Sequence, residues 1–205
     1  VVTAPATAVV VAGEVADVPI AVVGSPTATV TAVGLPAGLE LAPGEAGTWR
    51  ITGTPERAAG TYPVTLTADN GVVTTAELDV TVRTAPALAG PTSTEVALGE
   101  PVHVTWKADA SPVAALSVDG PLPDGLVAET GPGGTLAVTG TPFVPGHHEV
   151  TVVATNAHGR SRATWHLDVT TAPAFGPTTS AVLMEGRPAV VTIPVSGHPE
   201  PELSA

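Results

Sequence analysis

The sequence contains no cysteine, which excludes disulfides, thiol catalysis and cysteine-ligated metal sites. It also lacks any run of the ~18–20 uncharged apolar residues that a membrane-spanning helix needs, so we predict no membrane insertion. Basic residues are scarce, since 7 Lys and Arg stand against 19 Asp and Glu for a formal net charge of −12. This charge repels phosphate backbones, and the sequence therefore predicts no binding to nucleic acid.

Aromatic residues make up only 3% of the chain, whereas hydrophobic residues as a whole reach 43%. That hydrophobic content is too high for a disordered acidic segment. Gly and Pro, at 22 each, exceed their ordinary share and favour many short strands and turns over helices. The chain starts at Val1 without Met or a signal-peptide pattern, and we expect it to be an internal part of a longer protein.

The sequence repeats itself at an interval of 86 or 87 residues. Leu35–Leu39, which reads LPAGL, returns as Leu122–Leu126, which reads LPDGL. The tetrapeptide Thr84–Ala87, TAPA, returns unchanged as Thr171–Ala174. Several matches in one register indicate two complete copies of one structural unit and the beginning of a third.

The repeats divide the chain into residues 1–85, residues 86–172 and an incomplete third copy, residues 173–205. In each complete copy, apolar and polar residues alternate in about seven short runs, which is typical of half-buried strands. In the first copy these runs lie near residues 6–12, 16–23, 27–33, 39–42, 47–52, 61–69 and 72–82. The pattern predicts an all-β fold of tandem immunoglobulin-like antiparallel β-sandwiches.

Three motifs of the first copy resemble the putative Ig domain family of bacterial surface proteins: Gly34–Leu39 (GLPAGL), Ile51–Pro55 (ITGTP) and Ala68–Gly71 (ADNG). The second copy repeats the pattern in Pro121–Leu126 and Val138–Pro142. The resemblance implies an extracellular, secreted or cell-surface location, with neighbouring Ig-like repeats of the same chain as partners. It also implies a stalk, spacer or adhesion module, and the family has no characteristic catalytic residues. We therefore predict no enzyme activity, no catalytic residues and no cofactor-binding residues.

Calcium is the one cofactor that the acidic residues suggest, because cadherin-like relatives of this family bind it between domains with clustered carboxylates. Glu14, Asp69, Glu100 and Asp109 are the candidate ligands, since they approach the ends of the predicted sandwiches. Calcium prefers six to eight oxygen ligands, however, and these residues are spaced singly. Solvated surface carboxylates without calcium are the competing interpretation.

The six histidines raise the question of a metal or acid–base site. His147 and His148 are adjacent in a predicted strand and therefore point to opposite faces. His148 corresponds to Tyr62 of the first copy, where an aromatic side chain is expected to close a corner of the sandwich. A site made of His103, His147 and Glu149 is the competing interpretation.

Two further functions compete with that of a spacer or adhesion repeat. The first is an accessory module of a secreted hydrolase that binds carbohydrate, such as a surface glycan, or a protein ligand. Trp49, Trp106 and Trp165 share the phase of core residues, which predicts that they are buried and disfavours an aromatic platform for sugars.

The second competing function is a structural subunit of a filament or virion that assembles through residues 173–205. This third copy is expected to hold two or three strands near residues 180–184, 189–195 and 201–204. So few strands are marginal alone. They are either an excerpt of a longer array or an element that another chain completes by strand donation.

Overall fold

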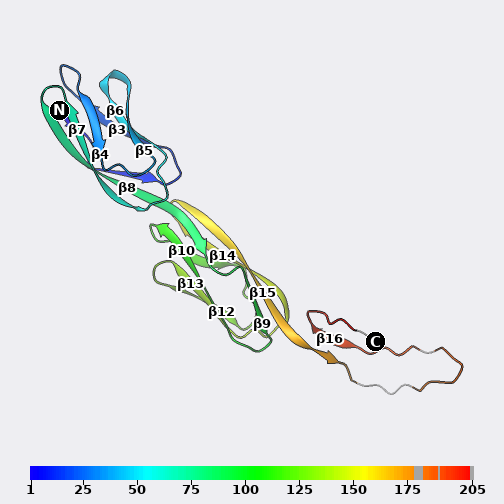
Figure 1. Cartoon of the computed structure of the whole chain (residues 1–205). Coiled ribbons are helices and arrows are strands. Elements are labelled where there is room, and N and C mark those ends of the chain that lie inside the picture. Colours follow the sequence, from blue (N-terminus) through cyan, green and yellow to red (C-terminus); the bar gives the residue numbers. More distant parts are fainter. Residues whose placement is uncertain (178–181, 189, 204–205) are drawn as a thin grey trace. The chain divides into compact units, whose positions relative to one another are not determined.

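The computed structural model describes residues 1–177, 182–188 and 190–203, and its regular structure is almost entirely β (Figure 1). Contacts divide the chain into two compact units. Unit 1 contains Val1–Ala87, Ala108–Ala115 and Ala154–Ser161, and unit 2 contains Leu88–Lys107, Leu116–Val153 and Arg162–Ala205. Within the described part of the chain, no helix has the length and apolar character needed to cross a membrane.

The first sandwich has its opening strand split between two sheets. One sheet has the order β1-β3-β6-β5, and in the other β4, β7 and β8 are neighbours while β2 runs parallel to β8. The predicted runs correspond to β2 through β8, and only the short β1 was missed. The strands are β1 (Val2–Thr3), β2 (Thr7–Val11), β3 (Ala16–Val22), β4 (Thr29–Val33), β5 (Leu39–Pro43), β6 (Trp49–Gly53), β7 (Gly60–Asp69) and β8 (Val73–Ala89), with a 3₁₀ turn, η1 (Glu45–Gly47).

Alternation along the strands builds the core of this first sandwich. On β7, Val64 and Leu66 are fully buried while Thr65 between them is on the opposite face, and on β3 Ile20 is 1% exposed. Each such side chain contributes about 1.5–3 kcal/mol relative to an exposed one. The remaining buried members of the cluster are Val10, Ala16, Val18, Leu39, Ile51, Leu78, Val80 and Val82.

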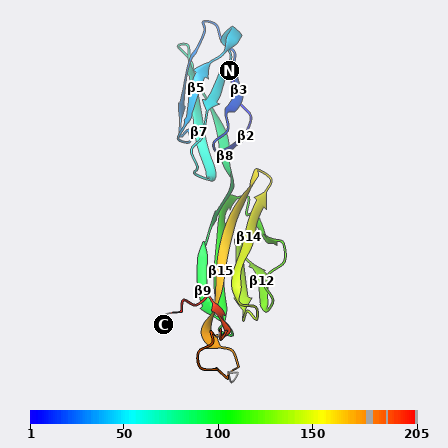
Figure 2. The same ribbon diagram turned by 90° about the vertical axis from the view of Figure 1, so that its right-hand side faces the viewer.

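The second sandwich repeats this topology. The end of β8 lies next to β10 in the order β12-β13-β10-β8, and the opposing sheet has β11-β14-β15 with β9 parallel to β15. Figure 2 shows β9, β15 and β14 side by side. This arrangement confirms the predicted class of tandem immunoglobulin-like sandwiches. The strands are β9 (Ser93–Ala97), β10 (Val102–Ser111), β11 (Ala115–Asp119), β12 (Leu126–Gly131), β13 (Thr135–Gly140), β14 (Gly146–Asn156) and β15 (Gly159–Phe175).

Two tryptophans fill the core of the second sandwich. Trp106 and Trp165 are fully buried, which confirms their predicted inward orientation, and their rings meet edge to face at 5.4 Å between centroids. The Nε1 atom of Trp165 donates a hydrogen bond of 3.0 Å to Thr94 Oγ1. Trp49 is half-buried and packs against the core of the first sandwich.

The predicted corner forms in both copies. The hydroxyl of Tyr62 donates a hydrogen bond to the carbonyl oxygen of Ala58 at 3.0 Å. His148 Nε2 makes the equivalent bond to the carbonyl oxygen of Val144, also at 3.0 Å, so its Nε2 carries the proton. A histidine therefore replaces a tyrosine in one role, and His148 is a structural residue.

The repeat extends to single hydrogen bonds in the loops. Cis peptide bonds precede Pro26, Pro112 and Pro199, which occupy equivalent places in the three copies. The side-chain amide of Asn70 donates to the carbonyl oxygen of Pro26, and that of Asn156 donates to Pro112, both at 2.9 Å. The same turn residue thus ties down the same loop in each complete copy.

Beyond the second sandwich, the described residues form one strand, β16 (Val195–His198), which pairs antiparallel with the end of β15. In the first sandwich, β1 pairs with β3 in the same way. The strands expected near 180–184, 189–195 and 201–204 do not form in their described parts, apart from Val195. Residues 178–181, 189 and 204–205 lie outside the described residues. The predicted boundaries after residues 85 and 172 fall within β8 and β15.

Candidate functional site

Four polar side chains meet on the outer face of unit 2, where β14 and β15 are neighbours (Figure 2). His147 and Glu149 come from β14, and His166 and Asp168 come from β15. Residues two apart in a strand share a face, so each strand contributes one histidine and one carboxylate to the same side. The residue between each pair faces the other way, as with Leu167, which is fully buried. We call these four residues the histidine–carboxylate cluster.

The atoms of the cluster converge on one carboxylate oxygen. Glu149 Oε1 lies 3.9 Å from Nε2 of His147 and 3.5 Å from Nδ1 of His166. The two imidazole rings stack, with centroids 5.3 Å apart and planes 22° from parallel. On the other side of its ring, Nδ1 of His147 lies 2.7 Å from Asp168 Oδ1. All four side chains are between 41% and 64% exposed, so the cluster is open to solvent.

Asp168 influences both the pKa and the tautomer of His147. Its hydrogen bond raises the pKa of His147 above the ordinary value, and the negative charges of Asp168 and Glu149 act in the same direction. Since a carboxylate only accepts, Nδ1 of His147 carries the proton in this bond and Nε2 is left facing Glu149. By contrast, Nδ1 of His166 is shielded from solvent and has no hydrogen-bond partner among the described residues, although it lies 3.5 Å from Glu149 Oε1.

The cluster offers a donor set for a metal ion. His147, Glu149 and His166 each contribute one ligand atom, and these atoms lie within 4.8 Å of one another. Among the residues that the structure describes, this is the one group of three or more His, Asp or Glu side chains arranged in this way. Two imidazole nitrogens and a carboxylate suit Zn²⁺, Cu²⁺ or Ni²⁺ better than Ca²⁺, which takes oxygen ligands.

Of the three residues that the sequence suggested for a site, His103, His147 and Glu149, the first does not lie with the other two. His103 is exposed as expected, but it lies on β10, in the other sheet of the sandwich. His166 takes its place, and Asp168 adds a partner for His147.

His166 and Asp168, which were not selected from the sequence, can be found from the strand register of the equivalent hairpin in the first copy. There, Thr61 pairs with Thr81 and Pro63 pairs with Asp79. The equivalent residues of the second copy lie 86 positions later on the first strand and 87 positions later on the second strand. The pairs there are His147 with Asp168 and Glu149 with His166.

The calcium candidates occupy separate positions. Glu14 lies in the turn between β2 and β3, Glu100 in the turn between β9 and β10, Asp69 at the end of β7, and Asp109 on β10. All four are exposed, and the Oδ1 atom of Asp69 accepts a hydrogen bond of 2.8 Å from the backbone N–H of Gly71. None belongs to the metal-type group found among the described residues, and calcium binding stays a prediction.

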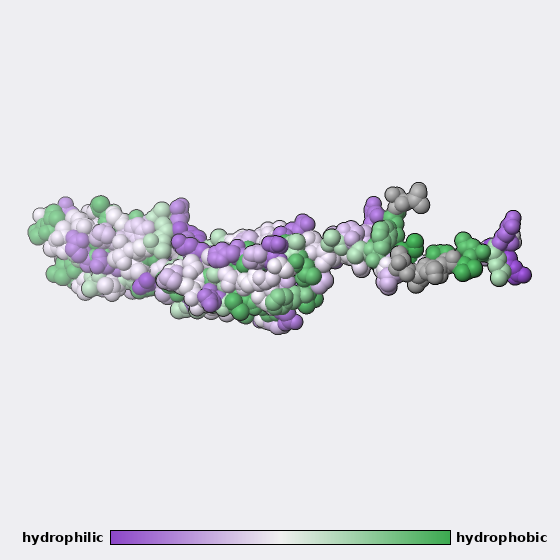
Figure 3. Space-filling view, turned by 90° about the horizontal axis from the view of Figure 1, so that it is seen from below, coloured by the Kyte–Doolittle hydropathy of each residue, from purple (hydrophilic) through white to green (hydrophobic). Residues whose placement is uncertain are grey.

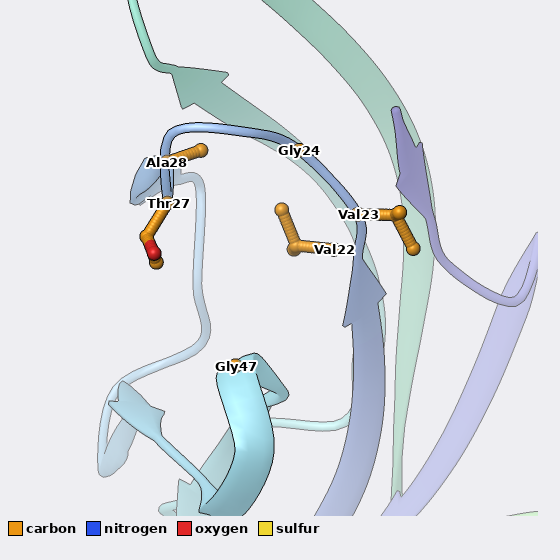
Figure 4. A pocket seen from close by; sticks show the side chains of 6 residues that line it. All are labelled: Val22, Val23, Gly24, Thr27, Ala28 and Gly47. Carbon is orange, nitrogen blue, oxygen red and sulfur yellow. The ribbon is translucent and has the colours of Figure 1, made fainter.

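The hollow shown in Figure 4 has a different character. It measures about 430 Å³ and lies at the end of β3, and its lining consists of Val22, Val23, Gly24, Thr27, Ala28 and Gly47. Val22 reaches into the hollow, whereas Val23 points to the opposite side of the chain. The lining provides one hydroxyl, that of Thr27, and no acid or base for proton transfer.

Family comparisons agree with the two sandwiches. Residues 1–85 match the family model described as Putative Ig domain, and residues 87–169 match the PKD domain model. The chain is a tandem of Ig-like domains. The match of residues 1–85 to the Putative Ig domain model confirms the resemblance seen in the motifs of that copy.

Solved structures of other tandem Ig domains share this fold. An I-band fragment of titin is 15% identical with a TM-score of 0.54, and the match covers 82% of this chain and 64% of that one. Two Ig domains of DIP-gamma are 14% identical with a TM-score of 0.58, covering 78% and 92%. The insect immune protein hemolin is 19% identical with a TM-score of 0.56, covering 82% and 46%.

This chain of Ig-like domains therefore spans less than two thirds of the titin fragment and less than half of hemolin. Sequence identities this low show the fold alone. No curated protein sequence matches the chain.

Proposed function

We propose that residues 1–205 are non-catalytic spacer or adhesion repeats of a larger bacterial protein that is secreted or displayed on the cell surface. The neighbouring Ig-like repeats of the same chain are the first partners in this proposal. The observation that carries it is the repetition of one sandwich, down to its corner and loop hydrogen bonds, with β16 starting the pattern again. In this proposal the repeated framework sets distance and position. The shared fold does not by itself specify a ligand.

The surface supports the same proposal. Figure 3 shows hydrophobic residues interspersed with hydrophilic ones over the face in view, as is ordinary for a solvated protein. Trp106 and Trp165, the two largest fully buried side chains, are unavailable as a platform for sugars. The hollow in Figure 4, whose lining residues include no acidic or basic side chain, further supports a role without catalysis.

The solution mass of residues 1–205 beside residues 1–172, measured by size exclusion with light scattering, tests this proposal. We expect both chains to be monomers, with and without calcium. Assembly of the longer chain alone would overturn the spacer proposal in favour of a filament or virion subunit. A change on adding calcium would instead direct attention to Glu14, Asp69, Glu100 and Asp109.

The accessory-module alternative needs a separate measurement. Saturable binding of residues 1–205 to a polysaccharide would support a carbohydrate-binding module of a secreted hydrolase. We expect no saturable binding on a glycan array, with an established carbohydrate-binding module as the positive control.

A further inference from the structure

We propose that His147, Glu149 and His166 form a binding site for a divalent transition-metal ion, Zn²⁺ in the first instance, on the outer face of the second sandwich. In this site Nε2 of His147, Nδ1 of His166 and a carboxylate oxygen of Glu149 are the ligands. Asp168 does not bind the ion but holds the ring of His147 in place. The proposal is independent of the spacer function.

The geometry needs only a small closure around the ion. Zn²⁺ binds nitrogen and oxygen at about 2.0–2.2 Å, so a tetrahedral site holds its ligand atoms about 3.4 Å apart. Glu149 Oε1 is already 3.5 Å from His166 Nδ1 and 3.9 Å from His147 Nε2. The three ligand atoms all lie within 4.8 Å of one another, and their side chains are 41–64% exposed. The fourth position is left to water or to a ligand from a partner.

The arrangement around His147 is typical of a metal-binding histidine. Such a histidine usually donates its other ring N–H to a carboxylate, which fixes the tautomer and the ring orientation. Asp168 lies 2.7 Å from Nδ1 of His147 and supplies this partner, while Nε2 stays directed at Glu149. The two carboxylates beside the imidazoles also supply negative charge that attracts a cation.

His166 provides a second, independent observation. Its Nδ1 atom is shielded from solvent, lies among the ligand atoms and makes no hydrogen bond within the described structure. Buried polar atoms nearly always have a hydrogen-bond partner. This nitrogen lacks one, and a metal ion at the proposed position supplies it.

The first sandwich shows that the fold does not require this cluster. At the positions of His147 and Asp168 it has Thr61 and Thr81, whose hydroxyl oxygens lie 3.1 Å apart. At the positions of Glu149 and His166 it has Pro63 and Asp79, so the combination of two histidines and two carboxylates occurs in the second copy and not in the first. A set of exposed ion pairs is the alternative, and exposed pairs contribute little to stability.

Calorimetric titration of the metal-free chain of residues 1–205 with ZnCl₂ tests the proposal. We expect saturable binding of one ion, with an affinity lowered at least about tenfold in His147→Gln and in His166→Gln. His103→Gln is the matched control, because it removes an exposed histidine from the other sheet of the same sandwich and is expected to leave the affinity unchanged. Circular dichroism melting shows whether each variant is folded.

Two further measurements separate the roles within the site. Asp168→Asn is expected to weaken Zn²⁺ binding about 10-fold, as is usual when an outer partner of a ligand is lost. Co²⁺ is expected to give a visible absorption band that Zn²⁺ displaces and Ca²⁺ does not. Unchanged Zn²⁺ affinity in His147→Gln and His166→Gln, or equal loss in His103→Gln, would overturn the proposal.

Discussion

The two sandwiches use the same framework and differ in what they place on one hairpin face. On β7 and β8, Thr61 and Thr81 join across the strands through their hydroxyls. On β14 and β15, His147 and Asp168 occupy the equivalent positions and make a shorter, charge-assisted contact. The outward-facing residues of a strand pair can therefore differ in chemistry between the copies, while the inward-facing residues form the core in both.

The inward faces differ in a more constrained way. The second copy has Trp106 and Trp165 where the first has Ile20 and Leu78, and both pairs are buried. The larger indole is matched by a smaller neighbour, because Gly90 stands where the first copy has Ala4. A Cβ atom at Gly90 would overlap the ring of Trp106. The core exchanges at these two positions are thus coupled.

The largest expected effect is on the tryptophan core. We expect Trp165→Ala to destabilise the second sandwich by about 3–5 kcal/mol, because it removes a fully buried indole and leaves a cavity. Urea unfolding followed by circular dichroism measures the change. Trp49→Ala is the control in the first sandwich, and its half-buried side chain should cost clearly less. Equal losses would show that burial does not distinguish the two sites.

A smaller loss is expected when the coupled core positions are mismatched. Gly90→Ala should destabilise by about 1–3 kcal/mol, since the new methyl group collides with Trp106. Combining it with Trp106→Ile recreates the Ala4 and Ile20 pair of the first copy and should cost less than the two single changes added together. Strict additivity in this double-mutant cycle would contradict the coupling.

The corner residues should lose about one hydrogen bond each. Tyr62→Phe and His148→Phe are both expected to destabilise their sandwich by about 0.5–1.5 kcal/mol, because each removes the donor to a carbonyl four residues earlier. Thermal melting of both variants checks this. A large effect in one copy and none in the other would show that the two corners are not equivalent.

The smallest effect on stability is expected on the outer face. His147→Thr combined with Asp168→Thr installs the pair of the first copy and should change the free energy of unfolding by about 0.5 kcal/mol or less. The same variant should lose Zn²⁺ binding. A strong destabilisation would mean that the cluster is structural, and the contrast between the copies would fail.

Much of the fold was predictable because each repeat carries its own local signals. The alternation in Tyr62, Val64 and Leu66 already indicated which side of β7 is buried, and the interval between copies carried that assignment to β14. The corner at His148 followed from the same alignment and from the preference of that position for an aromatic ring with a donor. These features depend on residues close together in the chain.

The candidate site was only half predictable for the opposite reason. His147 and Glu149 could be chosen as neighbours on one strand, but their partners His166 and Asp168 lie on another strand and are selected by hairpin register. The choice of His103 failed because an outward orientation does not say which sheet a strand joins.

The sequence by itself determined the repeat, the strands, the turn residues and the buried face, since period-two alternation can be recognised from residues that are adjacent in the chain. Only the tertiary structure decided that the first strand splits into β1 and β2, that Gly90 lies against Trp106, and that two histidines and two carboxylates share one patch. Each of these depends on distances between strands, which register and packing set and which no local pattern records.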